Sequence, residues 1–243
     1  MNKIVNRLED LPEVIDTRSL MRLTHGRLTM RMLNYALGKY ARGGRLVRIR
    51  RGFYSRTADP FYVASRMYSG YIGLSSALYL HGLKTEIEGS VLVCVPRPMR
   101  ELRFLGKTLV PVNLSKFAFG SALMQHGDFD VPVSTYPKTV FDMLYKPAYS
   151  NYFDLYRALH ARRLAPDEWR ALCRYLSGAN LTTARRAGYV LEQEAPAWFT
   201  KRLRQRSDSG KGSSFFLKHS MRNYRPGWRL FDDIGVDRWK NAE

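Results

Sequence analysis

Cysteine is scarce in this sequence, and long apolar runs are absent from it. The chain of 243 residues has two cysteines, Cys94 and Cys173, too few for a disulfide framework or a cysteine-based zinc site. It has no run of about 18 apolar residues, the length that a membrane-spanning helix needs. The first ten residues lack the apolar core of a signal peptide. We therefore expect a cytoplasmic protein that is neither secreted nor inserted in a membrane.

The residue patterns of enzymes and metal sites are also missing. The five histidines are scattered and are not paired at the spacing of metal ligands. Gly210-Lys211-Gly212 lacks the spacing and the following Ser or Thr of a phosphate-binding loop. Ser75, Ser76, His81 and Asp142 include the residue types of a hydrolase triad without its Gly-x-Ser-x-Gly elbow, so we expect packing roles, with Asp142 capping or paired in the second domain. We predict no enzymatic activity, no cofactor and no metal.

Acidic residues are absent from Thr17 through Ala58. In the whole chain 40 Lys and Arg outnumber 21 Asp and Glu, and the formal net charge of +19 predicts an acidic partner that offsets the self-repulsion. The acid-free stretch contains the basic residues Arg18, Arg22, Arg27, Arg31, Lys39, Arg42, Arg45, Arg48, Arg50, Arg51 and Arg56. Charge of one sign in a segment patterned to fold indicates a phosphate-facing surface. The alternative is an ordinary solvated basic face.

Two helices are predicted in this stretch. We expect Thr17 to cap a short helix over 18–23, and His25-Gly26 to interrupt the pattern. A longer helix then starts at Arg27. At about 100° per residue, its core-facing arc carries Leu28, Met32, Leu33, Tyr35, Ala36, Leu37 and Tyr40. The opposite, narrow arc carries Arg27, Arg31, Asn34, Gly38 and Arg42. This arc suits a DNA major groove, where Arg reads guanine and Asn reads adenine, although an amphipathic helix without a ligand stays open as an alternative.

A basic hairpin follows the glycines at 43–44. Residues 45–50 alternate as a strand, Arg51-Gly52 turns the chain, and residues 53–56 return it. We expect Arg48 and Arg50 on the same side of the strand. A basic hairpin after a basic-faced helix is typical of the wing of a winged helix, which grips the DNA backbone. The predicted DNA-binding residues are Arg27, Arg31, Asn34, Arg42, Arg45, Arg48, Arg50 and Arg51.

The fold class predicted for the whole chain is α+β, with an N-terminal winged helix-turn-helix over 1–58. Asp59-Pro60 marks a boundary, after which residues 59–206 predict a mixed α/β second domain with a small sheet and a helical C-terminal half. Strands are expected at 91–95, 108–112 and 131–133, and helices at 61–67, 75–80, 137–144, 152–161, 166–176, 182–191 and 197–206. The composition of 207–214 predicts a flexible linker. It begins a basic, aromatic tail, 207–243, which we expect to dock on the second domain through Trp228 and Phe231; the alternative is an arm that contacts phosphates.

Four segments resemble the motifs of a known family, in the family's order. The first is the predicted wing, Arg42–Tyr54, and the second is Tyr71–Leu83, which contains Ser-Ala-Leu and His-Gly-Leu. The third is Val133–Leu144, which has a proline turn and ends in Asp-hydrophobic-Leu, and the fourth is Arg186–Glu192, which contains Gly-Tyr and Leu-Glu. On these residues the chain resembles the AbiEi-type antitoxin and transcriptional-regulator family. It departs from the family's pattern at Tyr136 before the proline, Lys138 after it and Ala187 before the glycine.

The resemblance implies an antitoxin of a bicistronic pair whose toxin looks like a nucleotidyltransferase. It also implies that the second domain carries the antitoxin activity without needing stable contact with the toxin. The residues themselves argue only for a sequence-specific binder of double-stranded DNA, which we expect to repress its own promoter. Two alternatives stay open. One is an RNA-binding module, although the predicted basic face lacks the exposed aromatics that single-stranded RNA usually requires. The other is a stand-alone transcription factor without a toxin partner.

Overall fold

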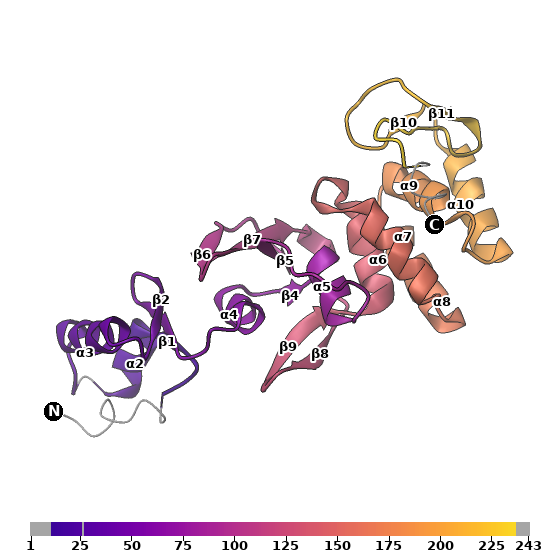
Figure 1. Ribbon diagram of the computed structural model, residues 1–243. Helices are drawn as coiled ribbons and strands as arrows, with labels where there is room; N and C mark the ends of the chain where they lie inside the picture. Colours follow the sequence, from indigo (N-terminus) through magenta and orange to yellow (C-terminus); the bar gives the residue numbers. More distant parts are fainter. Residues whose placement is uncertain (1–10, 26, 237–243) are drawn as a thin grey trace.

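The protein is built from helices and strands in a mixed α and β architecture, as its sequence predicts. The computed structural model describes residues 11–25 and 27–236. Within them, a small sheet with two helices occupies one end, a six-stranded sheet lies in the middle, and the helices of residues 136–209 gather at the other end with the tail (Figure 1). The N-terminal and C-terminal parts are therefore far apart.

The N-terminal part folds around a three-stranded antiparallel sheet. Strand β1 (Val14–Asp16) leads into helices α2 (Thr17–Leu23) and α3 (Met30–Arg42), which are followed by strands β2 (Val47–Arg50) and β3 (Phe53–Ser55). Strand β3 pairs with β1 on one side and with β2 on the other. One core joins the sheet to the two helices through the buried side chains of Leu11, Ile15, Leu20, Leu28, Leu33, Leu37, Leu46 and Tyr54.

The cap of α2 differs from the predicted one. Asp16, not Thr17, caps the helix, because its carboxylate accepts hydrogen bonds from the amides of Arg18 and Ser19. Thr17 lies in the first turn and is buried; its hydroxyl donates to the carbonyl of Gly52 at 2.9 Å. Thr17, the residue expected to cap α2, therefore connects this helix to the turn of the β2–β3 hairpin through a hydrogen bond.

The middle of the molecule is a mixed sheet in the order β6-β7-β5-β4-β9-β8. Its strands are β4 (Tyr71–Ile72), β5 (Ser90–Val95), β6 (Leu102–Phe104), β7 (Lys107–Asn113), β8 (Ser121–His126) and β9 (Phe129–Ser134). The pairs β5·β7 and β4·β9 are parallel, and the other pairs are antiparallel. The predicted strands β5, β7 and β9 are confirmed. Strands β4 and β6 were not predicted because they are very short, and β8 because it is a mostly exposed edge strand with only three apolar residues, Ala122 to Met124.

A second core links the N-terminal sheet to this six-stranded sheet. Helix α4 (Pro60–Met67), capped by the carboxylate of Asp59, packs here together with part of helix α5 (Leu74–Leu80). Ile49 of β2 is buried in the same cluster as Phe61 and Val93, and Val14, Val47 and Phe53 pack against it. The N-terminal sheet is thus covered by apolar side chains on both faces.

The helical half confirms the helices predicted from the apolar periodicity, with ends shifted by a few residues. They are α6 (Tyr136–Tyr145), α7 (Tyr152–Ala161), α8 (Pro166–Ser177), α9 (Leu181–Leu191) and α10 (Ala197–Ser209). Together with α5 and parts of the sheet they enclose the largest core of the described residues. Short strands β10 (Ser214–Phe215), β11 (Tyr224–Arg225) and β12 (Leu230–Phe231) follow and form a small sheet in the order β10-β12-β11.

The tail docks on the helical half over its described residues, up to Val236, as predicted. Trp228 is 2% exposed, and its ring lies so close to Gly188 of α9 that a Cβ there would be 2.0 Å from a ring carbon. The indole N–H donates to the Glu192 carboxylate at 3.1 Å. Phe231, the other predicted anchor, is partly buried, but its ring stacks on Phe215 and contacts Tyr224, both in the tail itself. Because only a glycine lets the ring approach this closely, Gly188 and Trp228 form one packing unit.

The predicted flexible linker over 207–214 is wrong. Ser207 lies in the last turns of α10 and is buried, with its hydroxyl donating to the carbonyl of Trp228. The guanidinium of Arg185 donates to the carbonyls of Ser207 and Gly210 and to the hydroxyl of Ser214 at 3.0 to 3.2 Å. The polar composition suggested solvent exposure, but a buried arginine satisfies these groups inside the fold.

We predict that Trp228→Ala lowers the free energy of unfolding by about 3–5 kcal/mol, since it empties a fully packed site. Trp198→Ala is the matched control, because Trp198 is 45% exposed, and it should cost less than about 1 kcal/mol. Urea unfolding followed by circular dichroism measures both. Equal losses for the two variants would contradict the docked position of the tail.

Candidate nucleic-acid interface

Helix α3 presents the predicted polar arc to solvent. Arg31, Asn34 and Arg42 are exposed, whereas Leu33 and Leu37 are completely buried on the other side. The hydroxyl of Thr29 caps α3, so Arg27 lies before the helix, exposed and in a bend, and not on its first turn as expected. The three remaining polar side chains of the predicted arc share one exposed face of the helix.

The core-facing arc of α3 is narrower than predicted. Tyr35 is 68% exposed and Met32 is 45% exposed, although the helical pattern placed both toward the core. The helix packs on α2 and the small sheet through a single stripe around Leu33 and Leu37, and that contact leaves the flanks of the helix open. An aromatic ring therefore lies in the basic face, contrary to the prediction that this face has none.

Gly38 leaves a notch in the same face. A Cβ built at Gly38 meets no atom within 4 Å, and its backbone is helical without a positive φ. Neither packing nor backbone conformation requires a glycine here, although glycine inside a helix costs about 1 kcal/mol relative to alanine. Gly38 thus lowers the stability of α3, and nothing in the described fold requires it. It lies three residues after Tyr35, about one helical turn away.

The hairpin presents its arginines on two faces. Its register shifts between Arg48 and Arg50, so that Arg48 is opposite Tyr54 while Arg50 is opposite Phe53. Because neighbouring strand residues point to opposite faces, the predicted common side of Arg48 and Arg50 is wrong. Both side chains are exposed, and the Arg50 guanidinium lies over the Phe53 ring at 4.2 Å. The bulge lets a short hairpin direct positive charge in two directions.

An open groove of about 850 Å³ joins α3 to the turn of the hairpin. It is lined by Asp16, Thr17, Arg18, Met30, Asn34, Arg50, Arg51, Gly52 and Phe53. Three segments that are distant in sequence, the start of α2, the first turns of α3 and the hairpin turn, therefore meet around one hollow. Of the predicted site residues, the fold brings Asn34, Arg50 and Arg51 together here.

The positive charge of this surface is not compensated within the described residues. None of the eight predicted site residues forms an ion pair there, and the nearby pair is Arg56 with Glu13 at 3.6 Å. Asp16 is the one carboxylate that lines the groove. Burial raises its pKa, but hydrogen bonds from Ser19 and the amide of Arg18, and the charge of Arg22, hold the pKa of Asp16 below its usual range. Asp16 is thus held in its charged form at the N-terminus of α2, inside the groove that Arg18, Arg50 and Arg51 also line.

A buried polar cluster in the second domain is the other concentration of reactive groups. Lys138 and Asp142 of α6 form a salt bridge with both side chains fully buried. The lysine also donates to the Tyr71 hydroxyl at 2.9 Å, and that hydroxyl donates to Asp142 at 3.0 Å. Burial raises the pKa of Asp142 to about 6, against the opposing effect of the lysine charge. The expectation that Asp142 is paired within the second domain is confirmed.

The residues of the nominal hydrolase triad are held apart by other partners. The Ser76 hydroxyl accepts from the amide of Leu92 at 2.9 Å, and the imidazole of His81 bonds the Ser134 carbonyl at 2.8 Å. Asp142 is occupied by Lys138. Each side chain thus satisfies a neighbour in the core, and no nucleophile, base and acid are lined up.

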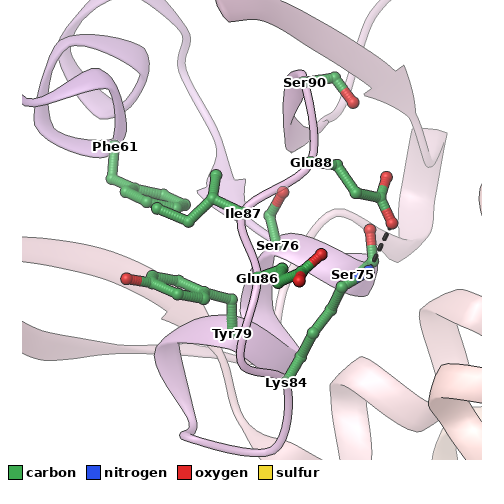
Figure 2. A pocket seen from close by; sticks show the side chains of 9 residues that line it. All are labelled: Phe61, Ser75, Ser76, Tyr79, Lys84, Glu86, Ile87, Glu88 and Ser90. Atoms are coloured by element: carbon green, nitrogen blue, oxygen red, sulfur yellow. Dashed lines mark hydrogen bonds and ion pairs between the residues drawn. The ribbon is translucent and has the colours of Figure 1, made fainter.

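The serines of α5 border only a very small cavity. Figure 2 shows Ser75 and Ser76 beside the segment that runs from Lys84 through Glu86 and Glu88 to Ser90. The enclosed space is about 10 Å³, about enough for one water molecule. Lys84 closes one side through salt bridges to Glu88 and Asp154. A substrate does not fit here.

Among residues 11–25 and 27–236, no three His, Cys, Asp or Glu side chains are grouped so that they would hold a metal ion. In the same part of the chain, each helix is too short or too polar to cross a membrane.

Comparisons with known proteins identify a structural neighbour but no family. No protein-family description and no curated protein matches the sequence. The fold is similar to the crystal structure of the RV2827C protein from Mycobacterium tuberculosis, with a TM-score of 0.64 over 98% of this chain and 92% of that chain. At 18% identity the similarity shows a shared fold along nearly the whole chain and nothing more specific.

We predict that Lys138→Met destabilises the protein by about 3–5 kcal/mol, because it leaves the carboxylate of Asp142 buried without its cation. The double variant Lys138→Met/Asp142→Leu should recover most of this loss, since it removes both charges. Thermal unfolding of wild type, both single variants and the double variant at neutral pH completes the cycle. Additive losses in the double variant would show that the pair is not coupled.

Proposed function

We propose that this protein is a sequence-specific regulator that binds double-stranded DNA through α3 and the β2–β3 hairpin. The observation that carries the proposal is the group of exposed arginines without an ion pair on these two elements. Arg50 and Arg51 of the hairpin line one groove together with Asn34 of α3. Proteins that neutralise phosphates with arginine gain affinity by releasing counterions. No other stretch of the sequence is free of acidic residues over such a length; the basic segment near the C-terminus contains the exposed Asp208 and the buried Asp232 and Asp233.

The chain order supports a winged helix over the N-terminal part. Strand, helix, helix and hairpin follow one another, and β3 lies between β1 and β2. In such a fold α3 is the recognition helix and β2–β3 is the wing. Helix α3 has three and a half turns and a polar exposed face, which suits the width of a major groove.

The proposed roles divide the site residues into two groups. Arg31 and Asn34 read base edges, since arginine pairs with guanine and asparagine with adenine through two hydrogen bonds. The residues that contact the backbone are Arg27 before the helix, Arg42 and Arg45 after it, and Arg48, Arg50 and Arg51 in the wing. Arginines that contact phosphates position the protein and carry no sequence information.

The four family-like motifs support a narrower proposal, in which the protein represses its own promoter and is the antitoxin of a nucleotidyltransferase-like toxin. Three of the motifs lie in the second domain, where Tyr71, Asp142 and Gly188 are core residues. They therefore support a similar fold more than a similar site. The gene next to this one is the cheapest test, since a nucleotidyltransferase there supports the antitoxin role and its absence favours a stand-alone regulator.

RNA binding is the second candidate, and one observation favours it. Tyr35 places an exposed ring within the basic face, and stacking of bases on such rings is how many proteins hold single-stranded RNA. A narrow RNA major groove does not admit a helix, so this candidate requires unpaired RNA. Competition between a DNA duplex and a single-stranded RNA of equal length separates the two functions.

We predict that Arg31→Ala and Asn34→Ala each cost about 1–3 kcal/mol of binding at the protein's own promoter and little on a scrambled duplex. Arg48→Ala should weaken both duplexes alike and reduce the salt dependence by about one unit of log-log slope. Fluorescence anisotropy titrations at several salt concentrations measure both effects. If Arg31→Ala and Arg48→Ala behave identically on the two duplexes, α3 is not the recognition helix.

We also predict opposite effects of Gly38→Ala on stability and on binding. The methyl group enters open space, so the variant should gain about 0.5–1 kcal/mol of unfolding free energy from helix propensity. The same methyl group should weaken promoter binding, because it fills the notch that faces the DNA. Gly89→Ala, a second site with open space, is the control for binding. A stabilised variant with unchanged affinity would place the DNA elsewhere.

A further inference from the structure

An apolar row crosses the basic face of α3. Met32, Tyr35 and Gly38 are spaced three residues apart, so their surfaces adjoin on the helix. Met32 and Tyr35 are 45% and 68% exposed, and the position of Gly38 is open. None of the three belongs to the buried core of the N-terminal part. The row therefore has no role in holding the fold together.

The charges around this row indicate the class of its partner. Arg31, Lys39 and Arg42 are exposed on the same helix, and the segment has no acidic residue from Thr17 to Ala58. An apolar protein surface or a neutral ligand would leave these charges unmatched, whereas a nucleic acid matches them. To contact the row as well, this nucleic acid must have an apolar group that lies between its phosphates and that a helix can reach.

Thymine has such a group. On the edges of the bases in the major groove, the 5-methyl group of thymine is the apolar feature, and apolar side chains contact it in known complexes. Uracil lacks this methyl group. A deep and narrow RNA major groove also excludes a helix. Of the nucleic acids, duplex DNA is therefore the one that fits both the row and the helix that carries it.

We propose that Met32 and Tyr35 determine specificity by contacting the 5-methyl groups of thymines, and that Gly38 lets the base edges approach the Tyr35 ring. This proposal rests on the proposed insertion of α3 into the major groove. Arg31 precedes Tyr35 by four residues, a rise of about 6 Å along the helix, which is between one and two base-pair steps. The operator half-site thus has thymine within about two base pairs of the guanine that Arg31 reads.

Replacing thymine by deoxyuridine tests the proposal directly. The probe is a fluorescein-labelled duplex of the protein's own promoter, compared with the same duplex in which each dT is replaced by dU. The wild-type protein should bind the dU duplex at least about four-fold more weakly, the effect of one lost methyl contact. A scrambled duplex and its dU version control for changes in DNA shape and should bind equally.

Variants at Tyr35 connect the effect to this side chain. Tyr35→Ala should bind the dT promoter more weakly and should lose the difference between dT and dU, whereas Tyr35→Phe should keep the difference. Tyr149→Ala is the matched control, since Tyr149 is 46% exposed in the second domain, and it should behave as wild type. Because Tyr35 is exposed, these variants keep the fold, which a melting curve verifies.

Each other outcome overturns the proposal in a distinct way. If the wild-type protein binds the promoter but does not distinguish dT from dU, or if Tyr35→Ala still does, the row does not read thymine, and the proposed function stands. If neither promoter nor scrambled duplex is bound, the proposed function falls as well. Tighter binding of a single-stranded, uracil-containing RNA than of the dT duplex would assign Tyr35 to base stacking on RNA.

Discussion

The two-sided packing of the small β1-β3-β2 sheet is the constraint on which the rest of the structure depends. Ile15 and Tyr54 point into the core under α2 and α3, while their neighbours Val14 and Phe53 point into the core of the six-stranded sheet. A strand alternates the direction of its side chains, so three short strands can be apolar on both faces. This sheet joins the basic helix to the body and leaves the outer face of α3 open to solvent.

The position of the positive charge follows from the same constraint. The core of the N-terminal part is small, and its buried polar residues are the uncharged Thr17, Thr24 and Ser55, so the described arginines of the segment lie outside it. In the second domain, by contrast, Arg185 and Arg186 are buried and donate to main-chain carbonyls. Buried arginines therefore bond the main chain in the helical half, whereas Arg31, Arg42 and Arg48 of the N-terminal part are exposed.

The motifs of the second domain have a structural explanation. Tyr71, Lys138 and Asp142 share one buried network, and Gly188 is pressed against Trp228. The buried carboxylate of Asp142 requires the charge of Lys138, and the close approach of the Trp228 ring requires a glycine at position 188. Residues with such packing roles can form a sequence motif without contacting a ligand. The RV2827C protein shares this fold over nearly its full length. This agrees with the view that the motifs of the second domain reflect the packing of the fold.

The sequence by itself determined the α and β architecture, the helices of the second domain and the basic character of the N-terminal part, because apolar periodicity and net charge are local properties of the chain. Only the tertiary structure decided which side of α3 is covered. The pattern assigned Tyr35 and Met32 to the core, but the small sheet contacts only the stripe around Leu33 and Leu37. In the same way, a bulge separated Arg48 from Arg50, and a buried guanidinium ordered the polar segment after Ser207. These outcomes depend on partners that are distant in sequence, which no local pattern contains.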